Sequence, residues 1–173
     1  VHLAAKVAEE KGYYVVSDTS YEGYTDIPKD VMQGYTIMVD ETIGQMEDTP
    51  THVFLQGGVG GFPAAVVSFL VESLECPPIF IVVEPKNADC LFQSAVNGKP
   101  TIVHGDLDTV MAGLACGEVS LLAWSILESH VLHYLTLEDN SVSKTMRLLA
   151  NRQTPIVAGE SAVAGLAGFL IAS

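Results

Sequence analysis

Positive charge is scarce in this sequence. The 173 residues include 8 lysines and arginines against 21 aspartates and glutamates, which gives a formal net charge of −13. The basic residues form no cluster, so the phosphate backbone of a nucleic acid and an anionic membrane surface are both poor partners. We therefore expect no nucleic acid and no membrane among the partners of this protein.

Cysteine pairs and long apolar runs are also missing. The three cysteines, Cys76, Cys90 and Cys116, are far apart and form no CxxC or CxxH pair, which argues against a disulfide framework and a zinc site. His130 and His133 lie close in sequence, but no third ligand accompanies them, so we expect no metal. No apolar run reaches the ~18 residues of a membrane helix. Reduced thiols and a cytoplasmic location are the resulting predictions.

Hydrophobic residues, by contrast, make up 49% of the chain and fall into short runs between helical patterns. The runs predict strands at 13–17, 51–56, 78–83, 101–103, 133–137 and 155–158. The helical patterns cover 1–12, 28–46, 63–75, 87–97, 140–151 and 161–173, with a loop and one or two helices in 108–129. Because the strands are continuously apolar, we expect a single α/β domain over 1–173: a mostly parallel, twisted sheet with helices on both faces.

Glycine is concentrated in one place, between a predicted strand and a predicted helix. The loop consists of Gly57, Gly58, Val59, Gly60 and Gly61. Backbone N–H groups and the helix dipole at such a junction favour an anion, most often a phosphate. A flexible turn is the plainer interpretation. No Lys-Ser or Lys-Thr follows, so an ATP-binding P-loop is excluded.

Two kinds of phosphate ligand fit this loop. A dinucleotide loop needs Gly-x-Gly-x-x-Gly, and Gly58 and Gly60 supply the first two glycines, but Pro63 occupies the third place. With Glu84 as a ribose-binding acid, a nicotinamide-binding domain of an oxidoreductase stays an alternative. A compact loop without the third glycine suits a single phosphate monoester, such as that of pyridoxal 5′-phosphate.

Several stretches carry a resemblance to a known family. They are SDTSYEGYTDIPKDVMQGYTIMVDE (17–41), PTHVFLQGGVGGFPAAV (50–66), VVEPKNADCLFQSA (82–95), TVMAGLACGEVSLLAWSIL (109–127) and GESAVAG (159–165). Together they resemble the diaminopropionate ammonia-lyases, which are fold-type II pyridoxal-phosphate enzymes. MAGLACGE and DTSYEGY are the most specific motifs. The glycine loop and Val-Glu-Pro are shared with serine and threonine dehydratases, so a dehydratase-like lyase is a second alternative.

The resemblance implies a function for the complete enzyme. Pyridoxal 5′-phosphate would be the cofactor, and 2,3-diaminopropionate would lose ammonia and yield pyruvate. The resemblance also implies a homodimer and a second, small domain. The family's cofactor-binding lysine lies in a segment that precedes the matching region, and none of the six lysines here has its sequence context. We therefore expect the chain to be a fragment of a longer two-domain enzyme, without activity alone.

The resemblance also assigns residues. Asp18 would be the catalytic residue, in proton transfer or in contact with the substrate amine; its plainer role is to cap a turn with Thr19 and Ser20. Gly57 to Gly61 would bind the cofactor phosphate. Ala112, Gly113 and Glu160 would lie on the substrate side, although close helix packing and helix-dipole chemistry are simpler explanations for them. A non-catalytic domain that kept the fold is a third possibility.

Overall fold

One parallel sheet forms the centre of the computed structural model, which describes residues 2–173. Among these residues the sheet has three strands, β1 (His52–Gln56), β2 (Ile79–Pro85) and β3 (His133–Leu137), in the order β1-β2-β3. His52 pairs with Ile79, and Ile81 pairs with His133. The predicted architecture, a parallel sheet in an α/β fold with helices on both faces, is confirmed.

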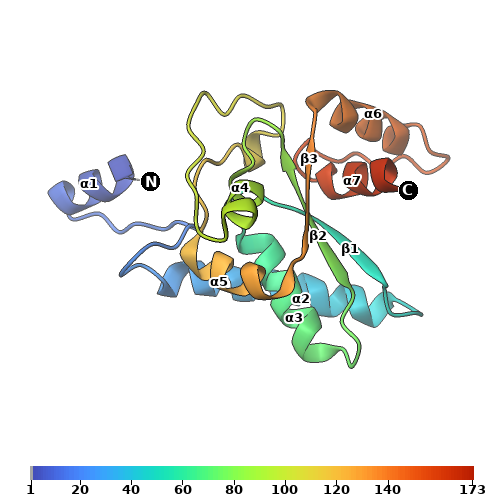
Figure 1. Ribbon diagram of the computed structural model, residues 1–173, viewed down its shortest axis with the longest axis horizontal. Coiled ribbons are helices and arrows are strands. Elements are labelled where there is room, and N and C mark those ends of the chain that lie inside the picture. Colours follow the sequence, from blue (N-terminus) through green and yellow to red (C-terminus); the bar gives the residue numbers. More distant parts are fainter. Residues whose placement is uncertain (1) are drawn as a thin grey trace.

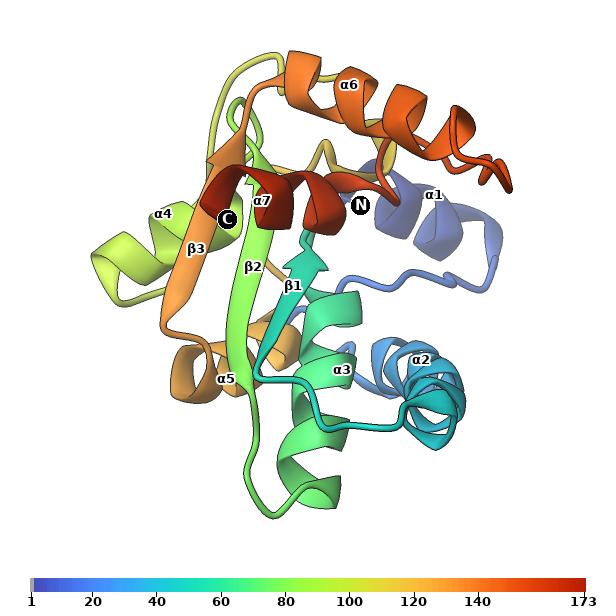
Figure 2. The same cartoon turned by 90° about the vertical axis from the view of Figure 1, so that its right-hand side faces the viewer.

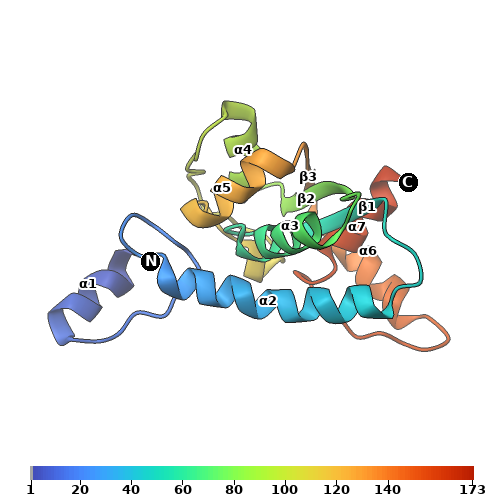
Figure 3. The same ribbon diagram turned by 90° about the horizontal axis from the view of Figure 1, so that it is seen from below.

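Helices cover both faces of the sheet (Figures 1 and 2). They are α1 (His2–Lys11), α2 (Asp26–Gln45), α3 (Gly61–Ser73), α4 (Cys90–Asn97), α5 (Leu121–His130), α6 (Asp139–Ala150) and α7 (Ala164–Ala172), with a short 3₁₀ helix, η1 (Ala112–Leu114). Figure 2 shows α7 lying across the strands, with α6 beside it. Figure 3 shows α2 as the outer helix along α3, and α1 apart from the rest.

The central strand β2 divides the hydrophobic core into two parts. Phe80 and Val82 belong to a buried cluster with residues of α2, α3, α4 and α5. Ile81 and Val83 belong to a second cluster with residues of α6 and α7. Successive side chains of a strand point to opposite faces, so a continuously apolar strand can serve both clusters. This is why residues 79–83 of β2 are one unbroken hydrophobic run.

Three predicted strands are wrong. Residues 13–17, 101–103 and 155–158 form no strand. Tyr14 and Val157 are 79% and 95% exposed, so neither of their segments is buried against the sheet. Val103 makes a backbone hydrogen bond, from its N–H to the Gly117 carbonyl, but no ladder follows. Strand-forming residues become a strand only where a neighbour offers a ladder and a buried face.

Candidate functional site

A cavity of about 810 Å³ opens where β1 ends. Its lining comes from the glycine loop, from the segments 102–107 and 113–118, from Asp18 and Thr19, and from Tyr35 of α2. Gln56, the last residue of β1, and Ser161 complete the wall near the sheet. The volume lies in the usual range of cofactor and small-molecule sites, ~300–1,000 Å³.

The glycine loop joins β1 to α3 and presents free amides. Gly60 has a left-handed backbone, with φ of 100°, and its carbonyl accepts the first helical hydrogen bond of α3, from Ala64 N at 3.0 Å. Among the described residues, the amides of Gly58, Gly60 and Gly61 donate to no protein acceptor. The Val59 amide acts on the Cys116 thiol, whose pKa it lowers against the larger rise caused by burial. Free donors at the start of a 13-residue helix form a natural anion cradle.

Gly57 differs from the rest of the loop. Its N–H donates to the Val83 carbonyl at 2.9 Å, so this amide continues the sheet and is not free for a ligand. A Cβ at Gly57 would lie 2.7 Å from Leu91 Cδ1 and 2.8 Å from Val82 Cγ1. Gly57 is also absent from the cavity lining. Glycine is therefore required here by the packing of the loop on β2 and α4.

Protein packing also explains two further glycines of the loop. A Cβ at Gly58 would lie 3.2 Å from Cys116 Sγ, and one at Gly60 would lie 3.1–3.2 Å from three core side chains. A Cβ at Gly61, in contrast, would have no neighbour closer than 3.9 Å, and Gly61 lines the cavity. What excludes side chains from 57, 58 and 60 is the protein itself, whereas position 61 has room on the cavity side.

Asp18 lies on a loop at the cavity, across from the start of α3. It does not follow a strand, contrary to the sequence prediction for 13–17. The Thr19 hydroxyl donates to Asp18 Oδ1 at 3.1 Å, and the Thr19 amide donates to Ser17 Oγ at 3.2 Å. The Asp18 carbonyl oxygen lies 3.9 Å from the Cβ that Gly61 lacks. Asp18 therefore belongs to a turn and also lines the cavity.

Of the three residues expected on the substrate side, one lines the cavity and two do not. Gly113 lines the cavity, and its N–H donates to Ser161 Oγ at 3.0 Å. Ala112 and Glu160 are adjacent to lining residues but are not part of the lining. Glu160 also does not open the last helix, because α7 begins at Ala164. Ser161, which the sequence analysis missed, takes the cavity position; its place beside Glu160 in the Gly-Glu-Ser motif was the available signal.

Glu84 lies under the site and does not face it. Its side chain is fully buried, and its two carboxylate oxygens accept hydrogen bonds from Leu91 N at 2.9 Å and Phe92 N at 2.7 Å. These are amides of the first turn of α4, so Glu84 caps that helix. Burial raises the pKa of Glu84 to about 8, although both amide bonds act in the opposite direction. A carboxylate used in this way cannot bind a ribose, which removes the basis of the nicotinamide alternative.

Two thiols lie at the glycine loop: the Cys90 thiol donates to the Gly58 carbonyl at 3.4 Å, and Cys116 lines the cavity. Burial, together with the carboxylates of Asp18 and Glu84, raises the pKa of the Cys116 thiol. A thiol kept protonated is a poor nucleophile. Cys116 is therefore part of the cavity wall, which agrees with the sequence-based view that no cysteine nucleophile is needed.

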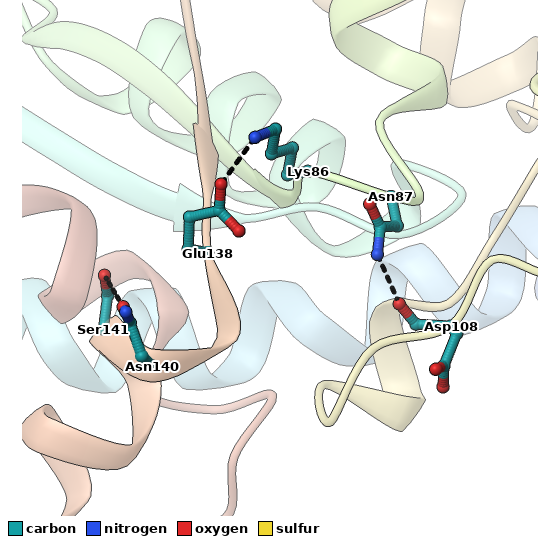
Figure 4. A network of polar contacts seen from close by, with 6 residues as sticks. All are labelled: Lys86, Asn87, Asp108, Glu138, Asn140 and Ser141. Atoms are coloured by element: carbon teal, nitrogen blue, oxygen red, sulfur yellow. Dashed lines mark hydrogen bonds and ion pairs between the residues drawn. The ribbon is translucent and has the colours of Figure 1, made fainter.

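Polar contacts hold the wall formed by the 102–118 segment. Asp139, at the start of α6, accepts hydrogen bonds from Thr109 Oγ1 at 2.6 Å and from Val110 N at 2.9 Å. In Figure 4 the Asn87 side chain donates to the Asp108 carbonyl, and Lys86 forms an ion pair with Glu138. The loops after β2 and β3 thereby hold the wall that packs beside the glycine loop.

A parallel α/β sheet with free amides at a strand–helix junction is the arrangement at which phosphate groups commonly bind. The model of the pyridoxal-phosphate dependent enzyme family matches residues 1–173, and the chain belongs to this family. The resemblance drawn from its motifs is confirmed.

Curated relatives refine this placement. The chain is 41% identical, over 96% of its length, to a diaminopropionate ammonia-lyase of Salmonella typhimurium, and 42% identical to one of Escherichia coli. It spans 44% of the length of each, so less than half of these relatives is represented. A probable D-serine dehydratase of Acinetobacter baylyi is 29% identical over 76% of the chain.

Solved structures agree. Holo diaminopropionate ammonia-lyase from Escherichia coli has a TM-score of 0.89 and 39% identity, and the match covers 98% of this chain and 44% of that one. Threonine deaminase isoform 2 from Solanum lycopersicum, at 20% identity and a TM-score of 0.81 over 95% of this chain and 42% of that one, shares the fold. Within the described part of the chain, none of the helices has the length and hydrophobicity that a membrane crossing requires.

Proposed function

We propose that the complete protein containing this chain, with pyridoxal 5′-phosphate as cofactor, removes the α-proton of 2,3-diaminopropionate and expels its β-amino group as ammonia. Water then hydrolyses the released aminoacrylate to pyruvate and a second ammonia. The observation that carries the proposal is the set of free amides at Gly58, Gly60 and Gly61, facing a cavity that Asp18 also lines. This set of amides occurs in a chain that is 41–42% identical to diaminopropionate ammonia-lyases.

The residues present fit the phosphate of this cofactor. Three free amides and the N-terminal dipole of α3 supply donors and partial positive charge, so the phosphate needs no basic side chain there. The segment from Gly113 to Gly117 packs against the glycine loop and lines the same cavity, whose volume of about 810 Å³ accommodates a ring and a small amino acid. When bound, the cofactor ring accepts the electron pair left when the substrate's α-proton departs.

Asp18 supplies the basic atom in this proposal. The Thr19 hydroxyl occupies Oδ1, so Oδ2 is the oxygen that takes the α-proton of the substrate. The buried turn around Thr19 orients the carboxylate before substrate arrives. General-base catalysis of this kind needs a group within hydrogen-bond reach of the proton that it removes.

The charge of the cavity favours a substrate with two amino groups. Asp18 and Glu118 line it, whereas none of the lining residues within 2–173 is lysine or arginine. Opposite charges attract strongly in a partly enclosed site. The second ammonium group of diaminopropionate is therefore attracted to these carboxylates, whereas the uncharged hydroxyl of serine is not. This supports diaminopropionate over serine. On the resemblance alone, we extend the proposal to a cytoplasmic homodimer with a second, small domain.

The test uses the complete enzyme, because no lysine lines the described cavity to hold the cofactor covalently. Pyruvate release is followed with each enantiomer of 2,3-diaminopropionate and of serine. We expect kcat/KM for diaminopropionate to exceed that for serine by about 10²-fold or more, since the site pairs with the second amine. A preference for serine would favour the dehydratase alternative, and no pyruvate from either would overturn the proposal.

The cradle has its own test. Gly60 is the wrong position for it, because its positive φ and its core neighbours make any side chain disruptive. Gly61→Val has space to fold and narrows the cradle, so cofactor affinity should fall about tenfold, equivalent to ~1.4 kcal/mol. Gly44→Ala, at a helical glycine with no neighbour within 4 Å, is the control. Equal cofactor affinity in Gly61→Val and wild type would show that the phosphate lies elsewhere.

A further inference from the structure

Two buried serines join distant parts of the chain beneath the site. Ser20 and Ser120 are 100 residues apart, and their exposed fractions are 1% and 0%. Their hydroxyl oxygens lie 2.8 Å apart, and Ser20 N donates to Ser120 Oγ at 3.0 Å. Ser20 Oγ also accepts from Leu122 N at 2.7 Å, and the Ser20 carbonyl accepts from Leu121 N at 3.2 Å. The pair thereby ties the 18–24 loop to the first turn of α5.

The same pair reaches the glycine loop. The Ser120 N–H donates to the Val59 carbonyl at 2.8 Å. A peptide unit is planar and trans, so its carbonyl and the following N–H point in opposite directions. Holding the Val59 carbonyl on α5 therefore directs the Gly60 N–H away from α5. Gly60 N–H is one of the free amides of the cradle.

The other end of the pair sets the position of Asp18. Only Thr19 separates Asp18 from Ser20, and Thr19 is buried and hydrogen-bonded to Asp18 Oδ1. A one-residue connection between a buried anchor and the carboxylate leaves little freedom in the position of Asp18. One hydrogen-bonded unit thus fixes the carboxylate on one side and the cradle on the other.

We infer that Ser20 and Ser120 are positioning residues, which hold Asp18 and the Gly60 amide in a fixed mutual arrangement. The catalytic part of this inference rests on the proposed function. The coupling of the 18–24 loop to the glycine loop does not rest on that function, because it follows from the hydrogen bonds alone. Neither serine touches the cavity, so both act through the groups that they position.

Amide hydrogen exchange in the complete enzyme tests the coupling without any activity. Ser20→Ala removes the acceptor of Leu122 N and the partner of Ser120. We expect exchange to become at least about tenfold faster both in the 17–24 peptide and in the 57–62 peptide. Ser125→Ala, at an exposed serine of α5 bonded to the Leu122 carbonyl, should change neither. Unaltered protection of 57–62 in Ser20→Ala would overturn the inference. Should Ser20→Ala fail to fold, Ser120→Ala is measured in the same way.

Kinetics test the positioning role. If Ser20 acts through Asp18, Ser20→Ala should lower kcat about tenfold with little change in KM, and should lower it no further in an Asp18→Asn background. Equal losses in both backgrounds would show that Ser20 does not act through Asp18 and would overturn the role. A wild-type enzyme without lyase activity would defeat the proposed function instead, while the exchange measurement still decides the coupling.

Discussion

Glu84 shows at the scale of one residue how burial governs charge. Its carboxylate gives up water for two backbone amides, and desolvation raises its pKa from 4.5 to about 8. The folded state therefore binds this proton more tightly than the unfolded state does. The stability that Glu84 contributes is fully present below pH 4.5 and is lost as the pH rises through about 8.

Glu84→Gln keeps the size of the side chain and removes the titration. We expect its free energy of unfolding to fall less steeply between pH 5 and pH 8 than that of wild type. Glutamine has one acceptor oxygen, so an amide of Leu91 or Phe92 loses its partner, at a cost of about 1–3 kcal/mol. Urea unfolding at several pH values measures both effects, with the exposed Glu128→Gln as control. Parallel pH profiles for wild type and Glu84→Gln would contradict the argument.

Asp18 is the residue on which the proposed chemistry depends. Asp18→Asn in the complete enzyme preserves the turn with Thr19 but removes the basic oxygen. Loss of a positioned acid–base group typically lowers the rate by about 10²–10⁴-fold. Cofactor affinity should not weaken, because the cradle consists of backbone amides. Turnover of both diaminopropionate enantiomers is the measurement, with Asp30→Asn, exposed on α2, as control. Unchanged turnover would reduce Asp18 to a turn residue.

At the scale of elements, α7 depends on close approach to the sheet. A Cβ at Gly165 would lie 2.6 Å from the Phe54 carbonyl oxygen, and one at Gly168 would lie 2.7 Å from Val83 Cγ2. Small residues on the inner face of α7 let its backbone lie directly on β1 and β2. Of the large apolar residues of the helix, Leu166 and Ile171 are exposed, and Phe169 is half-exposed with its ring packed edge-on against Phe54 of β1.

Gly165→Ala should therefore push α7 off the sheet. Its neighbour is a backbone oxygen that cannot rotate aside, so we expect a loss of about 1–3 kcal/mol in the free energy of unfolding. Gly159→Ala, in the loop before α7, has no neighbour within 4 Å and should be close to neutral. Thermal and urea unfolding give the free energy of unfolding of the two variants. A loss in Gly165→Ala but not in Gly159→Ala indicates close packing at Gly165, whereas similar losses in both indicate a general effect of replacing glycine. Equal stability would show that α7 adjusts its position.

At the scale of the whole molecule, apolar surface competes with net charge. Phe169, Leu170 and Ile171 are 47%, 43% and 55% exposed on adjacent positions of α7. Exposed apolar side chains gathered at the end of one helix promote association, while a net charge of −13 opposes it. Salt screens the charge and leaves the apolar surface unchanged. The balance should therefore shift toward association as ionic strength rises.

The 173-residue chain, expressed by itself, should self-associate in analytical ultracentrifugation, and more strongly in salt. Leu170→Glu together with Ile171→Glu should reduce this association, because the changes place charge in the apolar surface. Val96→Glu, at a side chain 66% exposed on α4, adds charge elsewhere and should have a smaller effect. A chain that stays monomeric at high concentration and high salt would count against α7 as a contact surface.

Local patterns in the sequence were sufficient for the fold class and for the glycine loop that lines the candidate site. The apolar run 78–83 predicted a strand buried on both faces, and β2 is that strand. Glycine density between a strand and a helix located the cradle, because helix start signals and strand periodicity act over only a few residues. The predicted helix at 140–151 likewise corresponds to α6 within one residue at each end.

Only the tertiary structure decided which groups those patterns bring together. Residues 13–17 have the composition of a strand, yet no neighbouring strand pairs with them. Glu84 followed a strand like a ligand-binding acid, but the amides of α4 enclose it. Ser20 and Ser120 carried no signal, since a contact across 100 residues leaves no trace in either segment. Strand pairing, burial and hydrogen bonding between distant segments are non-local, and they determine what each residue does.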